Sequence, residues 1–302
     1  MICFDDFKKI TLEDKKVFDE LYSRYPIVHS DYCFTTLISW MKYTNSRFYV
    51  GDDAILLSTE IEGKVRFRPP LGKQNASVFD EVLSLALREG CEEPLGMIDE
   101  STKEKMSALY PDLKCNEHRN FFDYVYNASD LASLSGSSYS KIRNRFNKFV
   151  KQYPYTIEDI SLVNIAEVNT FLQRWCLWRD CESDVILSAE RDAMMYSMNH
   201  FFELGLSGIV LRINDEIEAL AVYEALNKDT AVVHYEKGSP FYDGVYKAVN
   251  VETAKILEKH FRYINRESDM GIAGIRKAKQ SYRPSHMIKV YHVKRKDLEK
   301  FF

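Results

Sequence analysis

The alternation of apolar and polar positions is clearest in the last quarter of the chain, from Thr230 to Val293. An apolar, β-branched run over residues 230–237 ends in ionisable side chains and predicts a strand. A turn containing Gly244 follows, and apolar residues at helical spacing over 245–261 predict a helix. The pattern then predicts a strand over 263–269, a basic helix over 271–282 and a strand over 286–293. A strand, a turn and a helix N-terminus together present free backbone N–H groups, so this order predicts a site for an anionic group.

The rest of the chain also mixes helices and strands. Periodicity predicts helices over residues 12–25, 34–43, 77–89, 101–109, 140–152, 163–179 and 188–204. It predicts strands over residues 47–50, 54–58, 64–68, 95–98, 121–126, 155–160, 207–213 and 216–226. The small, polar segment 128–138 predicts a linker between an N-terminal domain, residues 1–127, and a C-terminal domain, residues 139–302. The two halves share an order of elements, which predicts a duplicated α+β module.

Composition narrows the class of protein. The 302 residues suffice for two domains, and 45% hydrophobic with 28% charged residues indicate a folded globular chain. The formal net charge of −4 is uneven, at −7 over residues 1–130 and +3 over residues 131–302. No acidic residue occurs between Asp269 and Asp297, where eight lysines and arginines lie. This basic half predicts an anionic ligand, namely a phosphate, a coenzyme or a nucleic acid.

Cysteine usage and the N-terminus predict the location. The six cysteines are scattered without a CxxC pair, which favours free thiols over disulfides or a metal site. The first residues lack the pattern of a signal peptide, and no apolar run approaches the roughly 20 residues that span a bilayer. We therefore expect a cytoplasmic protein without an integral membrane segment.

Four motifs carry a resemblance to a known family. They are Asp123-Tyr-Val-Tyr, the basic run 141–149, His234-Tyr-Glu-Lys followed by Gly244-Val-Tyr, and residues 264–284. With them the chain resembles the proteins grouped with the C-terminal domain of phosphatidylglycerol lysyltransferase, and its element order resembles the GNAT (acyl-CoA N-acyltransferase) fold. The resemblance covers nearly the whole chain and implies an α+β protein with two tandem GNAT-like domains.

The same resemblance implies an acyl or aminoacyl transferase. It implies a phosphate-bearing donor, either acyl-CoA or aminoacyl-tRNA, no tightly bound cofactor, and an amine or hydroxyl acceptor. Two departures stand out. The GNAT pyrophosphate loop, Arg/Gln-x-x-Gly-x-Gly/Ala, is replaced by Asp243-Gly-Val-Tyr with a single glycine, and the membrane-spanning segments of the lipid-modifying enzymes are missing. The missing second glycine favours the alternative of a non-catalytic binding module with a degenerate site, whereas the acids clustered at strand ends favour the enzyme, which is the leading hypothesis.

Acyl transfer needs a general base, and acidic or imidazole groups at strand ends are the candidates. His234 and Glu236 stand two residues apart on one predicted strand, so their side chains are expected on one face. Glu267 and Asp269 end the next strand and could reach the same cleft. Structural alternatives exist: His234 as a hydrogen-bonded core residue, Glu236 paired with Lys237 or Arg266, and Asp269 as a helix cap.

Three groups of residues are candidates for binding phosphate. Gly244, Val245 and Tyr246 open a predicted helix. Lys277, Lys279, Tyr282 and Arg283 belong to the basic C-terminal segment. Arg143, Arg145 and Lys148 lie on the basic helix after the predicted linker, as possible contacts to phosphate or nucleic acid. A simple turn and solvated helix faces are the alternatives. No HExxH, P-loop or GxGxxG motif occurs, so metalloprotease, NTPase and dinucleotide chemistries lack their usual signals.

Overall fold

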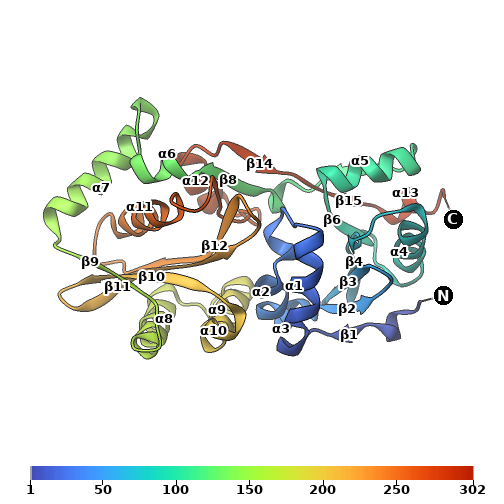
Figure 1. The fold of residues 1–302 in the computed structure, drawn as a ribbon, viewed down its shortest axis with the longest axis horizontal. Helices are drawn as coiled ribbons and strands as arrows, with labels where there is room; N and C mark the ends of the chain where they lie inside the picture. Colours follow the sequence, from blue (N-terminus) through green and yellow to red (C-terminus); the bar gives the residue numbers. More distant parts are fainter. Residues whose placement is uncertain (1, 302) are drawn as a thin grey trace. The chain divides into compact units, whose positions relative to one another are not determined.

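The computed structural model describes residues 2–301, which form two compact units. The first unit contains residues up to Phe122 together with 288 onward, and the second contains Asp123–Met287. Each unit is a mixed sheet with helices, coloured by sequence in Figure 1. The expected α+β class with mixed sheets flanked by helices is confirmed.

The sheet of the first unit is built on an antiparallel meander. Its strands are β1 (Lys8–Lys9), β2 (Arg47–Val50), β3 (Ala54–Ile61), β4 (Lys64–Phe67), β5 (Leu71–Gly72), β6 (Leu95–Asp99), β7 (Cys115–Glu117) and β15 (Val290–Val293). The order is β1-β2-β3-β4-β6-β15-β7, with β5 on β3. Strands β4 and β6 form its parallel pair, through Phe67 and Leu95. Glu62 and Gly63 both have positive φ, which gives a tight hairpin turn between β3 and β4.

Six α-helices lie in the described part of the first unit. They are α1 (Lys15–Arg24), α2 (Phe34–Ser39), α3 (Met41–Thr44), α4 (Ala76–Glu89), α5 (Glu100–Leu109) and α13 (Arg295–Leu298). One core joins apolar side chains of α4 to Leu56, Phe67, Ile98 and Tyr291 of the sheet. The helix expected over 34–43 is interrupted at Trp40, so it forms the two short helices α2 and α3.

The sheet of the second unit repeats this pattern. Its strands are β8 (Asp123–Asn127), β9 (Thr156–Asp159), β10 (Ser207–Ile213), β11 (Glu216–Ala225), β12 (Thr230–Gly238), β13 (Tyr263–Asn265) and β14 (His286–Ile288). The order is β14-β8-β13-β12-β11-β10-β9. The parallel pair of β12 with β13 again follows an antiparallel meander, and β13 pairs antiparallel with β8. Asn214 and Asp215, both with positive φ, make the two-residue turn between β10 and β11.

Helices cover both faces of the second sheet (Figure 1). They are α6 (Ala128–Ser133), α7 (Ser140–Gln152), α8 (Ile165–Arg179), α9 (Val185–Asn199), α10 (Phe201–Leu204), α11 (Val245–Leu257) and α12 (Ala273–Ser281). On one face, Val245, Ala248 and Val249 of α11 pack with Phe149 of α7 against β10 and β11. On the other face, α8 contacts β11 and β12.

The boundary between the units differs from the expected linker. Residues 128–133 form α6, and Leu131 is fully buried in the core of the second unit. The preceding strand, β8, belongs to the second sheet, and the last strand, β15, belongs to the first sheet. Small, polar residues predicted an exposed segment, but Ala128, Leu131 and Ala132 fall at helical spacing and supply an apolar face. The repeats therefore exchange their last strands.

Candidate functional site

The candidate site lies where β12 and β13 separate. The two strands pair only from Thr230–Tyr263 to Val232–Asn265. Beyond that point β12 continues to Gly238, whereas the segment after β13 bonds to β8 instead: Arg266 N–H donates to the Tyr124 carbonyl at 2.9 Å. The backbones of β12 and of the segment after β13 are therefore not paired here. The gap between them is filled by polar side chains from β12, from residues 266–269 and from α11.

A buried ion pair forms the centre of the site. The Glu236 carboxylate pairs with the Arg266 guanidinium, and their side chains are 11% and 14% exposed. Asn250 of α11 donates a hydrogen bond from Nδ2 to Glu236 Oε1 at 3.1 Å. Glu236 thus has the arginine partner that the structural alternative named. This pairing leaves the carboxylate in the site with both oxygens engaged, Oε2 by Arg266 and Oε1 by Asn250.

The Arg266 guanidinium is held between aromatic rings. It lies 4.6 Å from the centroid of the Tyr282 ring and 5.8 Å from that of Tyr126. Its Nη2 binds Glu236, whereas Nε and Nη1 are buried and donate no hydrogen bond of normal geometry to a described residue. Buried donors of a charged group are costly to leave unpaired, so these two N–H directions are suited to an anionic or carbonyl oxygen of a substrate.

Lys247 brings an amine to the same cluster. It lies in the first turn of α11, and its Nζ is 4.1 Å from the centroid of the Tyr282 ring. Burial, reinforced by the neighbouring charge of Arg266, lowers the pKa of Lys247 to about 8, although Glu236 opposes the shift. A substantial fraction of Lys247 is therefore neutral near physiological pH. No sequence pattern indicated a role for Lys247, because it is an isolated lysine in an ordinary helical pattern.

His234 does not share a face with Glu236, contrary to the expectation. Opposite β12, Val222 pairs with Tyr235 and Tyr223 pairs with Val233, so His234 is the extra residue of a β-bulge. Its side chain joins Glu224 and Glu267, with Nε2 and Nδ1 each 2.8 Å from a carboxylate oxygen. The bulge reverses the simple alternation along the strand, and this explains the difference.

The contacts of His234 count against a role as general base. Burial would lower its pKa, but the hydrogen bonds to Glu224 and Glu267 outweigh it and raise the pKa to about 10. With a side chain 3% exposed, His234 is a buried imidazolium at neutral pH. It instead neutralises two carboxylates, which is the role of a hydrogen-bonded core residue.

Asp269 anchors the start of α12. Its carboxylate accepts hydrogen bonds from the Tyr124 hydroxyl at 2.6 Å, from Gly271 N–H at 2.9 Å and from Arg276 through Nε at 2.8 Å. Burial would raise the pKa of Asp269, but the Arg276 and Tyr124 hydrogen bonds hold it well below its usual range. These contacts are those of an anchoring residue rather than of a base, and the N-cap of α12 itself is Ile272.

Lys279 supports the loop that carries Arg266. Its ammonium donates to the carbonyls of Arg266, Glu267 and Ser268 at 2.5, 3.1 and 2.6 Å. Burial lowers the pKa of Lys279 to about 8. Of the other residues expected to bind phosphate, Tyr282 is buried beneath Arg266, whereas Lys277 and Arg283 are exposed. Of the four candidates in the basic C-terminal segment, Tyr282 and Lys279 therefore belong to the cluster around the gap, and the other two do not.

The turn before α11 is built for packing. Gly244 has a φ of 99°, and a Cβ there would lie 3.0 Å from Phe149 Cβ and 3.2 Å from the Arg145 carbonyl oxygen. Val245 N–H, one of the expected phosphate donors, already bonds to the Tyr242 carbonyl at 3.1 Å. The Tyr246 hydroxyl accepts from Trp175 Nε1 at 3.0 Å. The helix opening thus offers less to a diphosphate than the sequence predicted.

The basic residues of α7 also have partners within the unit. Arg145 donates from Nε to Asp243 at 3.0 Å, and Lys148 lies 3.6 Å from the same carboxylate. Arg143 donates to the carbonyls of Leu134 and Gly136. Asp243 places a negative charge at the turn, which opposes binding of phosphate at that point.

Comparison with known proteins identifies the family. Residues 22–294 match the family described as "Phosphatidylglycerol lysyltransferase, C-terminal". The chain belongs to this family. A conserved protein of unknown function from Bacteroides thetaiotaomicron is 30% identical, with a TM-score of 0.87 over 95% of this chain and 99% of that one.

More distant structures share the fold. L-PGS from Bacillus licheniformis is 12% identical, with a TM-score of 0.64 over 93% of this chain and 92% of that one. FemX is 11% identical, with a TM-score of 0.56 over 98% of this chain and 99% of that one. These likenesses and the two mixed sheets bear out the expected fold of two tandem α+β domains.

One curated relative is similar over part of its length. An uncharacterized protein of Mycoplasmoides gallisepticum is 28% identical over 179 residues, which are 59% of this chain and 57% of that protein. The chain therefore spans little more than half of the relative's length. Among the described residues, the helices are all too short or too polar to cross a membrane.

Proposed function

We propose that this protein transfers an acyl or aminoacyl group to an amine or hydroxyl, with the chemistry in the gap between β12 and β13. Membership of the lysyltransferase C-terminal family and the GNAT-like fold support acyl or aminoacyl transfer in general. The observation that carries the site is the buried Arg266, with two donors, Nε and Nη1, that have no hydrogen-bond partner among the described residues, and a titratable amine, Lys247, on the same aromatic ring.

Each group has a role in this proposal. Arg266 donates hydrogen bonds to the oxygen that becomes negatively charged in the tetrahedral intermediate. Glu236 and Asn250 hold the guanidinium in place, and Lys279 holds the backbone that carries it. Lys247, when neutral, takes the proton from the attacking amine or hydroxyl. Glu236, the base favoured by the sequence, then acts as a positioning residue for Arg266.

Between the two donors, we favour aminoacyl-tRNA over acyl-CoA. A diphosphate at the start of α11 would meet the Asp243 carboxylate and a Val245 N–H that is already bonded. The family's name also refers to transfer of a lysyl group. A carrier RNA can bind over a wide surface and does not require the glycine-rich pyrophosphate loop that this chain lacks.

The donor test is a transfer assay with the full chain. A panel of aminoacyl-tRNAs and acyl-CoAs, each labelled in the acyl group, is mixed with simple amines, and the labelled product is measured. We expect transfer from at least one aminoacyl-tRNA, with binding that weakens steeply as salt rises because RNA binding releases counterions. Transfer from acyl-CoA alone would reverse the choice of donor. Donor binding without transfer would favour the non-catalytic binding module.

The role of Lys247 predicts a specific pH profile. Turnover should rise as the pH increases through about 8, because the neutral amine is the active form. Lys247→Met should lower turnover by roughly 10²-fold and remove this rise, since general bases contribute about 10²–10⁴-fold. The profile of kcat against pH, measured with the preferred donor, checks this.

Two controls make the profile interpretable. Lys255→Met changes a lysine of the same helix that pairs with Glu252 at the surface, and it should leave the profile unchanged. Lys279 also has a pKa of about 8, and Lys279→Met removes the hydrogen bonds that hold the Arg266 loop. This variant should lower turnover at every pH without abolishing a rise that belongs to Lys247. If Lys247→Met keeps the rise, Lys247 is not the base.

A further inference from the structure

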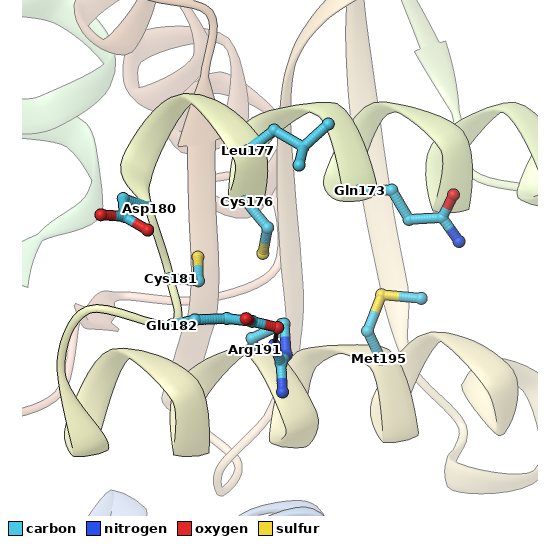
Figure 2. A pocket seen from close by; sticks show the side chains of 8 residues that line it. All are labelled: Gln173, Cys176, Leu177, Asp180, Cys181, Glu182, Arg191 and Met195. Carbon is cyan, nitrogen blue, oxygen red and sulfur yellow. Dashed lines mark hydrogen bonds and ion pairs between the residues drawn. The ribbon is translucent and has the colours of Figure 1, made fainter.

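A cavity of about 420 Å³ lies between α8 and α9 of the second unit, on the sheet face opposite α11. Figure 2 shows the side chains of Cys176 and Cys181 side by side at one end of it, with Met195 across the cavity. Cys176 is half-buried and Cys181 is buried, with 3% of the residue exposed. Both thiols are free, and neither takes part in the proposed transfer.

The end of α8 brings these two cysteines together. Asp180 has a φ of 51°, Asp180 N–H bonds to the Leu177 carbonyl at 3.4 Å, and Cys181 N–H bonds to the Cys176 carbonyl at 3.1 Å. These two bonds define a Schellman motif, in which Cys176 and Cys181 are the two positions whose side chains normally touch. In this motif a pair of thiols, Cys176 and Cys181, therefore takes the place of the usual hydrophobic contact.

We propose that Cys176 and Cys181 form a reversible disulfide that closes the end of α8. The oxidant is a small-molecule disulfide of the glutathione type. The Cys176 thiolate attacks one sulfur of that molecule and releases one thiol, which leaves a mixed disulfide on Cys176. The Cys181 thiolate then attacks the Cys176 sulfur and releases the second thiol. The protein loses two protons and two electrons, and the small disulfide gains them.

The cavity gives the oxidant access to Cys176, and the burial of this thiol sets the rate of its oxidation. Cys176 lines the cavity and is the more accessible thiol, so it reacts first. Burial, together with the hydrogen bond to the Cys181 thiol, raises the pKa of Cys176 to about 12. Oxidation should therefore be slow at neutral pH and faster in alkaline solution, because the thiolate is the reacting form.

The bridge would act on a contact next to the candidate site. Trp175, the residue before Cys176, bonds through Nε1 to the Tyr246 hydroxyl, and Lys237 Nζ lies 4.2 Å from its ring centroid. Lys237 follows Glu236 on β12, and Tyr246 precedes Lys247 on α11. Fixing the last turn of α8 therefore restricts Trp175, which touches both elements that carry the site.

The test is a thiol map of the full chain after incubation with oxidised glutathione. Trypsin cleaves after Arg174, Arg179 and Arg191, so the disulfide would join peptide 175–179 to peptide 180–191. We expect this linked pair to be the main product, to be lost on reduction with dithiothreitol, and to form faster as the pH rises. Amide hydrogen exchange in residues 175–181 should slow in the oxidised protein.

Single variants separate the bridge from ordinary surface oxidation. Cys181→Ser should trap glutathione on Cys176, because no second thiol can release it, whereas Cys91→Ser, at a half-buried cysteine of the other unit, should leave the linked pair unchanged. Links from Cys176 to other cysteines, stable mixed disulfides in the parent protein, or two unmodified thiols after prolonged alkaline treatment would each overturn the proposal. These readouts do not depend on transferase activity.

Discussion

Arg266→Lys is expected to lower turnover by about 10²–10³-fold, the usual effect of removing one donor to a developing oxyanion. Lysine retains the positive charge that faces Glu236 but lacks the planar fork that carries the Nε and Nη1 donors. The loss should appear in kcat more than in KM, because the missing hydrogen bonds are strongest in the transition state. Steady-state kinetics with the preferred donor measures both constants.

The matched control for this variant is Arg262→Lys. Arg262 is exposed, lies four residues earlier in the chain and stacks on Tyr263 with 5.0 Å between the guanidinium carbon and the ring centroid. It should keep parental turnover, and circular dichroism should show both variants folded. An Arg266→Lys protein that turns over at the parental rate would remove Arg266 from the mechanism and leave the family assignment untouched.

His234→Gln is expected to destabilise the second unit by about 3–5 kcal/mol at neutral pH, the cost of removing one partner of a buried ion pair. The imidazolium satisfies Glu224 and Glu267 at once, so its loss leaves two largely buried carboxylates facing a neutral amide. Urea unfolding at several pH values measures the free energy of unfolding of parent and variant.

The same experiment has a pH signature. The pKa of His234 is raised from 6.5 to about 10 on folding, so its stabilising effect is complete below about pH 6.5 and is lost as the pH rises through about 10. The difference between parent and variant should shrink over that interval. His200→Gln is the control, because His200 is more exposed and lies 3.4 Å from Glu203, a surface pair of small energetic value. A pH-independent difference would contradict a buried imidazolium.

Local chemistry made much of the second unit predictable from its sequence. Asn214-Asp215 specified its hairpin because both residues tolerate positive φ. The run 230–237 specified a strand. The bulge at His234 could not be read in the same way, because it depends on pairing with Val222 and Tyr223, residues of another strand. The sequence therefore placed the acids near the gap but could not assign their partners.

The proposed catalytic group depends on contacts between residues that are distant in sequence. Arg266 was foreseen only as a partner of Glu236, since nothing in its own segment indicates the Tyr126 and Tyr282 rings on which it lies. Lys247 became notable only through its burial. Likewise, the Val245 N–H looked available until the Tyr242 carbonyl was found to accept from it. Periodicity shows which side chains are buried, but not which polar groups they meet.

Because the repeats exchange their last strands, the sheets of the two units can be completed at different times during synthesis. Residues 123–287, the second unit, are contiguous, so its sheet can be completed once they have left the ribosome. In the first unit, the place between β6 and β7 belongs to β15, which is translated after the second unit. The first unit is therefore begun before the second but completed after it. Until then β6 and β7 have unpaired edges, which a chaperone or another nascent chain can reach.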